Sequence, residues 1–347
     1  MMMNEPMSSN ILFSALARAG LLAAVCQILT TPAHAAPAPP HNAVAGNLRV
    51  EVLDFDNTSN SVALSWETRI GDISIVPDLS NNGDYAIQIG ATRTNDVPEG
   101  VLLTAVRQNG RDLGHPLYPG LQAATAHIDY YKPGTTDDAG QSVENGYWIP
   151  VALTRPNSLG TAVSEWDTDV AVAWFPYNRY IGAFVRNESF ANGGPLNLLE
   201  SSPGLVPGRH FVDLGSGRAL VDLREFGIDA RTDGVLLAVG AKNEDNYALV
   251  RVNETDGTWT LYSKDNGTDG SSTEQDPFAF VFIPRTDPHL VAGRFQGDGT
   301  ILLHGGDVAP FTITPLAEGT WELKIRNASP RSGVLLICPE GGPARQF

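Results

Sequence analysis

Apolar and polar residues alternate along most of the patterned segments of this chain, which predicts β-strands. Over residues 48–53 and 321–325, apolar side chains occupy most of the alternate positions. A strand with one face in the core and one face in water has this period of two. Turn-forming pairs such as Asp256-Gly257 separate the segments. The best helical candidate, residues 220–226, alternates equally well as a strand, so the sequence predicts an all-β protein with little helix.

Short motifs recur along the chain and indicate an internal repeat. Gly-Val-Leu-Leu appears at residues 100–103, 234–237 and 333–336, and an apolar run closed by proline appears at residues 170–176 and 278–284. Gly-x-Trp also occurs three times. The first two sets of motifs keep one order along the chain, whereas in the third set Gly-x-Trp precedes Gly-Val-Leu-Leu. We interpret the pattern as a diverged tandem duplication with a unit of roughly 100–130 residues; the alternative is chance recurrence of common strand residues.

The predicted architecture is a tandem arrangement of diverged β-sandwich or jelly-roll-like units with mostly antiparallel strands. A β-rich N-terminal domain is expected over residues 48–160, and a β-rich C-terminal region containing a diverged repeat over residues 161–347. The repeated positions hold Gly, Pro, Trp and aliphatic residues, which build a framework. The third Gly-Val-Leu-Leu either closes the last sheet or leaves an open edge for a partner strand or for self-association.

The first 35 residues have the pattern of a secretory signal peptide. Arg18 supplies a positive charge, residues 21–29 are a short apolar stretch, and residues 33–35 (Ala-His-Ala) form a cleavage site after Ala35. A Pro- and Ala-rich linker is expected over residues 36–47. The apolar stretch is shorter than the about 20 residues that a membrane-spanning helix needs. The sequence therefore predicts an exported protein without a membrane span, which is secreted to the extracellular space or stays in the periplasm or at the cell surface.

Charge and cysteine content narrow the classes of partner and fold. The chain has 39 acidic and 23 basic residues and a net charge of −16. An acidic surface repels the phosphates of nucleic acids, so no nucleic-acid partner is expected.

Cys26 lies in the predicted leader, which leaves Cys338 as the sole cysteine of the mature chain. An intramolecular disulfide and a multi-cysteine zinc site are thereby excluded for that mature chain.

One short motif resembles the nucleophile motif of haloacid-dehalogenase-type phosphatases. It comprises residues 54–58 (Asp-Phe-Asp-Asn-Thr), which follow an apolar segment. The resemblance implies nucleophilic attack on phosphorus by Asp54, acid–base work by Asp56, and assistance by Mg²⁺. That family places the motif in a parallel α/β sheet, whereas residues 59–66 predict another strand immediately afterwards. The pattern therefore favours a hairpin turn capped by Asp and Asn side chains.

A second acidic segment is a candidate Ca²⁺ loop. Asp265, Asn266 and Asp269 supply oxygen ligands close together, and Gly267 and Gly270 permit sharp turns. The segment lacks the full twelve-residue loop and its terminal bidentate Glu. Its alternative interpretation is a solvated turn between strands. Apart from the Mg²⁺ that the phosphatase resemblance implies, Ca²⁺ is the one cofactor that the residues suggest.

Aromatic residues cluster in the middle of the chain and suggest a glycan surface. Exposed Tyr and Trp rings stack on sugars, and nearby Asp and Asn side chains bond to the hydroxyl groups. Trp148 and Trp174 belong to the repeated framework and are expected in the core. The candidate ligand-binding residues are Tyr130, Tyr131, Tyr177 and Tyr180, of which Tyr177 and Tyr180 are expected at the surface.

The sequence favours a non-enzymatic, secreted or cell-surface β-repeat protein that binds a glycan, a matrix component or an extracellular protein. The alternative is a secreted carbohydrate-active hydrolase or lyase on a β-sandwich scaffold. Such an enzyme needs two suitably spaced carboxylates, and a chain this acidic contains many pairs by chance. The histidines are scattered, without a His-x-His pair. No residue pattern identifies a reaction centre.

Overall fold

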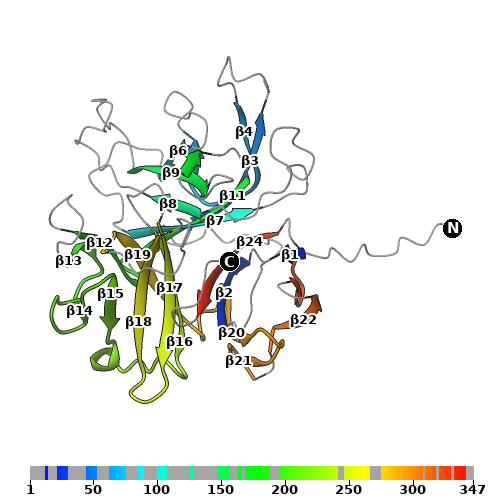
Figure 1. The fold of residues 1–347 in the computed structure, drawn as a ribbon. Coiled ribbons are helices and arrows are strands. Elements are labelled where there is room, and N and C mark those ends of the chain that lie inside the picture. Colours follow the sequence, from blue (N-terminus) through cyan, green and yellow to red (C-terminus); the bar gives the residue numbers. More distant parts are fainter. Residues whose placement is uncertain are drawn as a thin grey trace.

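The described part of the chain, in a computed structural model, consists of β-strands and one short 3₁₀-helix (Figure 1). The structure describes residues 12–14, 22–29, 44–52, 62–75, 84–89, 100–107, 125–128, 147–156, 163–165, 169–187, 195–240, 246–265, 275–307, 309–317, 320–329 and 332–340. Within these ranges the strands form several sheets and pair antiparallel, except for one parallel register pair between β17 (Asn246–Asn253) and β24 (Gly333–Glu340). The predicted all-β, mostly antiparallel fold is confirmed. Among the described residues, no helix has the length and the apolar character that spanning a bilayer requires.

Two sheets are built mainly from the N-terminal half. The first has the strand order β4-β3-β11-β7 and comprises β3 (Val44–Val52), β4 (Val62–Ile70), β7 (Gly100–Arg107) and β11 (Asp169–Pro176). The other has the order β10-β9-β6-β5, with β8 also on β9, and comprises β5 (Ile73–Ile75), β6 (Asp84–Ile89), β8 (Thr125–Ile128), β9 (Tyr147–Pro156) and β10 (Val163–Glu165).

The remaining strands form three further sheets. One has the order β13-β12-β19-β16 and comprises β12 (Ile181–Asn187), β13 (Leu196–Ser201), β16 (Gly234–Gly240) and β19 (Phe278–Pro284). The largest has the order β14-β15-β18-β17-β24-β2-β20-β21 and adds β2 (Leu22–Leu29), β14 (Phe211–Asp213), β15 (Arg218–Val221), β18 (Thr258–Asp265), β20 (Leu290–Gln296) and β21 (Ile301–His304). The smallest has the order β1-β23-β22 and comprises β1 (Leu12–Ser14), β22 (Phe311–Ala317) and β23 (Thr320–Ile325). The 3₁₀-helix η3 (Arg224–Phe226) lies between β15 and β16.

The repeated motifs pair with each other in the same register. In β7 and β11, Gly100 lies opposite Pro176, and in β16 and β19, Gly234 lies opposite Pro284. In both sheets the Gly-Val-Leu-Leu strand thus runs along the apolar strand that the proline ends. The duplication that would explain this correspondence stays a prediction.

The two motif glycines also have the same surroundings. A Cβ atom at Gly100 would lie 2.7 Å from the ring of Trp174, and one at Gly234 would lie 2.7 Å from the ring of Phe282. In each case it would also lie within 2.6 Å of the carbonyl oxygen that precedes the proline. Glycine is therefore needed at both positions because the neighbouring backbone and ring fill the space of a side chain.

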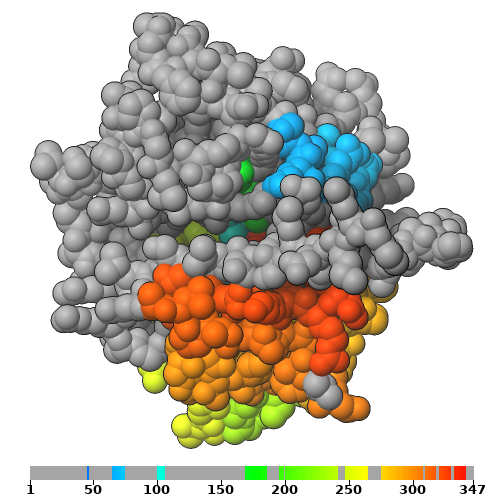
Figure 2. Space-filling view, turned by 90° about the vertical axis from the view of Figure 1, so that its right-hand side faces the viewer, coloured from blue at the N-terminus to red at the C-terminus, as the bar shows by residue number. Residues whose placement is uncertain are grey.

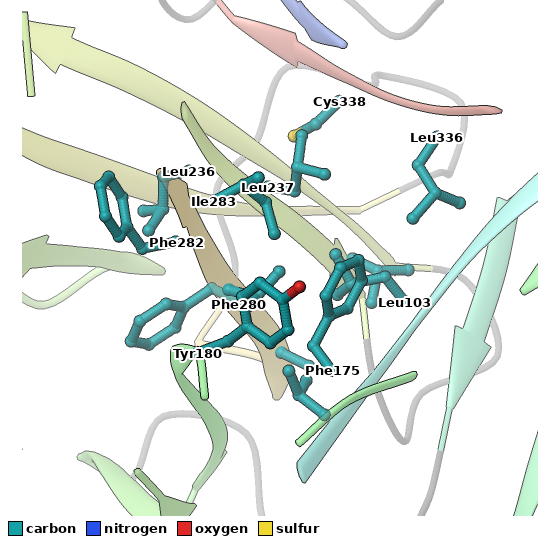
Figure 3. Packing of buried hydrophobic residues seen from close by; sticks show 14 of the residues in the cluster. Leu103, Phe175, Tyr180, Leu236, Leu237, Phe280, Phe282, Ile283, Leu336 and Cys338 are labelled. Atoms are coloured by element: carbon teal, nitrogen blue, oxygen red, sulfur yellow. The ribbon is translucent and has the colours of Figure 1, made fainter. Parts of the chain in front are cut away.

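The main core lies where the three Gly-Val-Leu-Leu strands meet. β7, β16 and β24 pack against one another, and side chains from all three, such as Leu103, Leu237 and Leu336, belong to one buried cluster (Figure 3). Trp174 is buried there, as expected of a framework residue. Cys338 is a buried free thiol in the same cluster, and burial raises its pKa to about 12.

A second, smaller cluster lies on the other face of β20. It comprises Val291, Phe295, Phe311, Ile313, Trp321 and Leu323, from β20, β22 and β23. Figure 2 shows the surface of the C-terminal strands around this cluster, in orange, as one continuous body. β20 is therefore covered by apolar side chains on both of its faces.

The predicted leader and the fold overlap. Residues 1–35 are the predicted leader, and within them the structure places Leu12–Ser14 and Leu22–Leu29 in sheets as β1 and β2. The reason is that β2 has hydrogen-bonding partners on both sides, namely β20 and β24. Cleavage after Ala35 stays a prediction.

Strand pairing also crosses the other predicted boundaries, which stay predictions. β3 begins at Val44, within the predicted linker, and β11, which follows residue 160, pairs with β3 and β7. The ambiguous segment 220–226 is divided, since its first residues belong to β15 and its last to η3.

The phosphatase-like residues 54–58 lie outside the described residues. The strands on either side of them, β3 and β4, pair antiparallel as a hairpin, which does not fit the parallel sheet of that family.

Candidate functional site

The predicted metal loop lies almost wholly outside the described residues. Asp265 ends β18, whereas Asn266 and Asp269 fall outside the described ranges. Among the residues that the structure describes, no group of three or more His, Cys, Asp or Glu side chains is arranged to hold a metal ion. The Ca²⁺ site stays a prediction.

The structure corrects the expected exposure of two candidate tyrosines. Tyr130 and Tyr131 lie outside the described residues, but the exposed fractions of Tyr177 and Tyr180 are 5% and 3%. A tight turn, closed by the bond from the Tyr180 N–H to the Pro176 carbonyl (3.0 Å), directs Tyr180 inward. Its ring packs edge-on against Phe175 (Figure 3). Tyr177 and Tyr180 therefore offer no ring face to a sugar.

Exposed apolar side chains occur instead in the segment between β13 and β16. Val206, Leu214 and Phe226 have exposed fractions of 44%, 44% and 39%. This segment contains β14, β15 and η3, so its loops are fixed by short strands. A large exposed apolar side chain in such a well-anchored segment is a candidate contact for a partner.

Local turns place the backbone of Val206 and the ring of Phe226 each against His210. The His210 N–H donates to the Val206 carbonyl (2.9 Å), which closes a turn over residues 206–210. Gly227, with φ of 75°, ends η3 directly after Phe226. The rings of His210 and Phe226 lie 4.8 Å apart. We call Val206, Arg209, Glu225 and Phe226 the Phe226 surface.

A buried histidine supports this surface from beneath. His210 is 5% exposed, and its Nδ1 accepts a hydrogen bond from the Val206 N–H at 3.1 Å. In a neutral ring the proton is then on Nε2, which lies 3.0 Å from Glu225 Oε2 and donates to it. Both ring nitrogens are engaged, so His210 positions Glu225.

Glu225 is held from the other side by an arginine. Arg209 Nε donates to Glu225 Oε1 at 2.7 Å, and Arg209 Nη2 lies 2.5 Å from Oε2. The bonds from Arg209, and then the bond from His210, lower the pKa of Glu225. The carboxylate therefore stays ionised while about half of the side chain remains exposed.

Two further Arg–Asp pairs attach the segment to the turn between β17 and β18. Arg224 donates to both oxygens of Asp222, at 2.9 and 2.6 Å, and Arg231 forms a similar pair with Asp229. Each guanidinium also reaches a carbonyl of the turn 253–257. The Arg231 hydrogen bond lowers the pKa of Asp229 to about 2.

No family model matches the sequence, no curated protein is similar to it, and no solved structure matches its fold. The functional conclusion therefore rests on the chemistry of the described residues.

Sequence reasoning missed the Phe226 surface. The contact between His210 and Glu225 joins residues fifteen positions apart through a turn that no periodic pattern predicts. A local signal was present only for the two neighbouring Arg–Asp pairs, because Asp-x-Arg occurs both at Asp222–Arg224 and at Asp229–Arg231. In an irregular segment, an arginine two positions after an aspartate can fold back and donate to its carboxylate.

Replacing Arg231 by methionine should raise the pKa of Asp229 from about 2 towards its ordinary value of 3.8. A depressed pKa stabilises the fold fully above the unfolded-state pKa, and this contribution is lost as the pH falls through the folded-state value. The parent should thus lose it between about pH 4 and pH 2. NMR titration of the Asp229 carboxyl measures the shift, and Arg218→Met is the matched control. An unchanged Asp229 titration in Arg231→Met would contradict the assignment.

Proposed function

We propose that this protein is an exported, non-enzymatic binding module that binds a partner protein through the Phe226 surface. The observation that carries the proposal is the pair of exposed apolar side chains, Val206 and Phe226, beside a fixed Arg209–Glu225 pair. Aromatic and arginine side chains contribute most to the energy of protein interfaces. Since His210 and Arg209 already hold Glu225 in place, little side-chain freedom is lost on binding.

The charge of the chain indicates the kind of partner. A net charge of −16 favours association with a partner that presents basic groups. A glycan ligand stacked on Tyr177 and Tyr180 is less favoured, because the rings of both residues are buried. Export is taken from the predicted leader, and the partner is accordingly an extracellular, periplasmic or cell-surface protein.

The test compares variants of the Phe226 surface with a matched variant elsewhere. Phe226→Ser and Arg209→Glu should each weaken partner binding at least about tenfold, as expected for interface residues worth more than 1 kcal/mol. Leu302→Ser, which alters a similarly exposed apolar side chain on β21, should leave binding unchanged. Partners are identified by cross-linking in the exported protein fraction of the producing cell, and affinities are then measured with the purified partner.

Two parallel assays complete the experiment. Thermal unfolding should show that the Phe226 variant is still fully folded at the temperature of the binding assay, which separates loss of binding from loss of fold. A reducing-sugar release assay with a panel of polysaccharides tests the alternative enzyme function. Turnover of any polysaccharide would overturn the non-enzymatic proposal, and glycan-array binding that survives Phe226→Ser would move the ligand site elsewhere.

A further inference from the structure

β20 and β24 flank a position in the largest sheet that β2 fills. Residues Leu22–Ile28 pair with β20, and Leu22–Leu29 pair with β24, both antiparallel. β2 is therefore a central strand of this sheet. It is also the apolar stretch of the predicted leader, which is the part of the chain that cleavage after Ala35 would remove.

The topology shows what kind of strand belongs there. In the first two sets, Gly-Val-Leu-Leu strands β7 and β16 pair with the proline-closed runs β11 and β19, and the sheets continue with the hairpins β3-β4 and β12-β13. In the third set, β24 pairs with β2, and the sheet continues with the hairpin β20-β21. β2 thus occupies the position that an apolar run occupies in the other two sheets.

β20 and β24, the two strands that form the walls of this position, are covered by apolar clusters on both faces of the sheet. Along β20 and β24, residues such as Ala292 and Leu336 belong to the main core, whereas Val291 and Phe295 belong to the second cluster. A strand with both faces covered needs a nearly continuous apolar sequence. Residues 22–29 (Leu-Ala-Ala-Val-Cys-Gln-Ile-Leu) have such a sequence, interrupted only by Gln27.

An ion pair joins the two walls directly. Arg294 of β20 donates through Nε and Nη2 to the two carboxylate oxygens of Glu340 on β24, both at 2.8 Å. The two side chains are only 4% and 2% exposed. In the register, Arg294 stands opposite Ala24 of β2 and Glu340 stands opposite Leu22, so this pair crosses the sheet at the N-terminal end of β2. The two walls are therefore fixed to each other by contacts that do not involve β2.

We propose that the gap between β20 and β24 is a strand-acceptor site for an extended apolar segment. Leu22–Leu29 fills it in the uncut chain. After removal of residues 1–35, the site takes an apolar strand of a second exported protein, which adds its backbone hydrogen bonds to both walls. The proposal shares only the predicted leader with the proposed function, since the Phe226 surface lies on other segments.

The experiment uses the full chain with a specific protease site inserted after Ala35, so that the leader is cut only after folding. The N-terminal fragment should stay bound to the remainder through size-exclusion chromatography. A labelled peptide with the sequence of residues 22–29 and a lysine tail should exchange into the cut protein, and a peptide of residues 278–284 should compete with it. A scrambled peptide of the same composition should not bind.

A proline variant tests whether pairing of β2 holds the fragment. Ala24→Pro removes an N–H from a central strand, so the cut fragment should dissociate at least about tenfold faster than in the parent. Ala38→Pro, in the predicted linker, is the matched control. If Ala24→Pro fails to fold, peptide exchange into the cut parent still decides the question.

Two results would overturn the strand-acceptor site. The first is loss of the fragment without faster amide exchange in β20 and β24, and the second is failure of the labelled peptide to enter the cut protein. Peptide exchange into a cut Phe226→Ser chain keeps this proposal separate from the proposed function, because that variant should bind the peptide as the parent does.

Discussion

Replacing Arg294 by methionine should lower the free energy of unfolding by about 3–5 kcal/mol, because the change leaves the Glu340 carboxylate buried without its partner. Glu340 is 2% exposed, and its remaining hydrogen bond comes from the Val252 N–H at 3.0 Å. One backbone donor cannot replace a bidentate guanidinium. Urea unfolding of the full chain measures the loss.

The double variant Arg294→Met/Glu340→Leu is the informative control. Replacing both charges by apolar groups removes the uncompensated charge, so the double variant should be more stable than Arg294→Met alone. Arg218→Met, at an exposed position, should change stability by less than about 0.5 kcal/mol. A loss below about 1 kcal/mol in Arg294→Met would show that Glu340 is not held as a buried charge.

Phe280→Ala should lower the free energy of unfolding by about 3–5 kcal/mol through the cavity that it leaves. Phe280 is fully buried on β19 and stacks on Phe211, with ring centroids 6.3 Å apart. β19 lies between β12 and β16, so neighbouring strands limit the collapse of the cavity. Denaturant unfolding with an unchanged slope reports the loss.

The matched control is the same substitution at the surface. Phe226 is 39% exposed, and Phe226→Ala should cost well under half of what Phe280→Ala costs, because less apolar area returns to water. Equal losses in the two variants would contradict the placement of the main core around β19.

The strands could be predicted from the sequence because their periodicity is local. Residues 321–325 alternate and lie in β23, and residues 278–284 form a continuous apolar run in β19 that is covered on both faces. The pairing of these strands could not be predicted, since it depends on contacts between distant segments. The opposition of Gly100 and Pro176 is an example, because three other described strands, β8, β9 and β10, lie between them in the chain.

The candidate site was harder to predict than the fold. Tyr180 lies in the polar stretch after Pro176, which predicts exposure, but its hydroxyl donates to Asp287 at 3.0 Å and so its ring can be buried. A tyrosine satisfies its single polar group with one partner, and that partner lies 107 positions away. Likewise, only the folded turns bring His210 beneath Glu225.

The direction of β2 and β24 determines how this sheet would carry mechanical load. Leu22 and Glu340 lie opposite each other at one end of the antiparallel pair. Tension passed through the chain before Leu22 and the chain after Glu340 therefore enters at that end and separates the pairs in turn, as a zipper opens, without shearing them together. Arg294 of β20 forms its ion pair with Glu340 at the same end. The first residue pair to be loaded, Leu22 and Glu340, is therefore also the pair that an ion pair connects to β20.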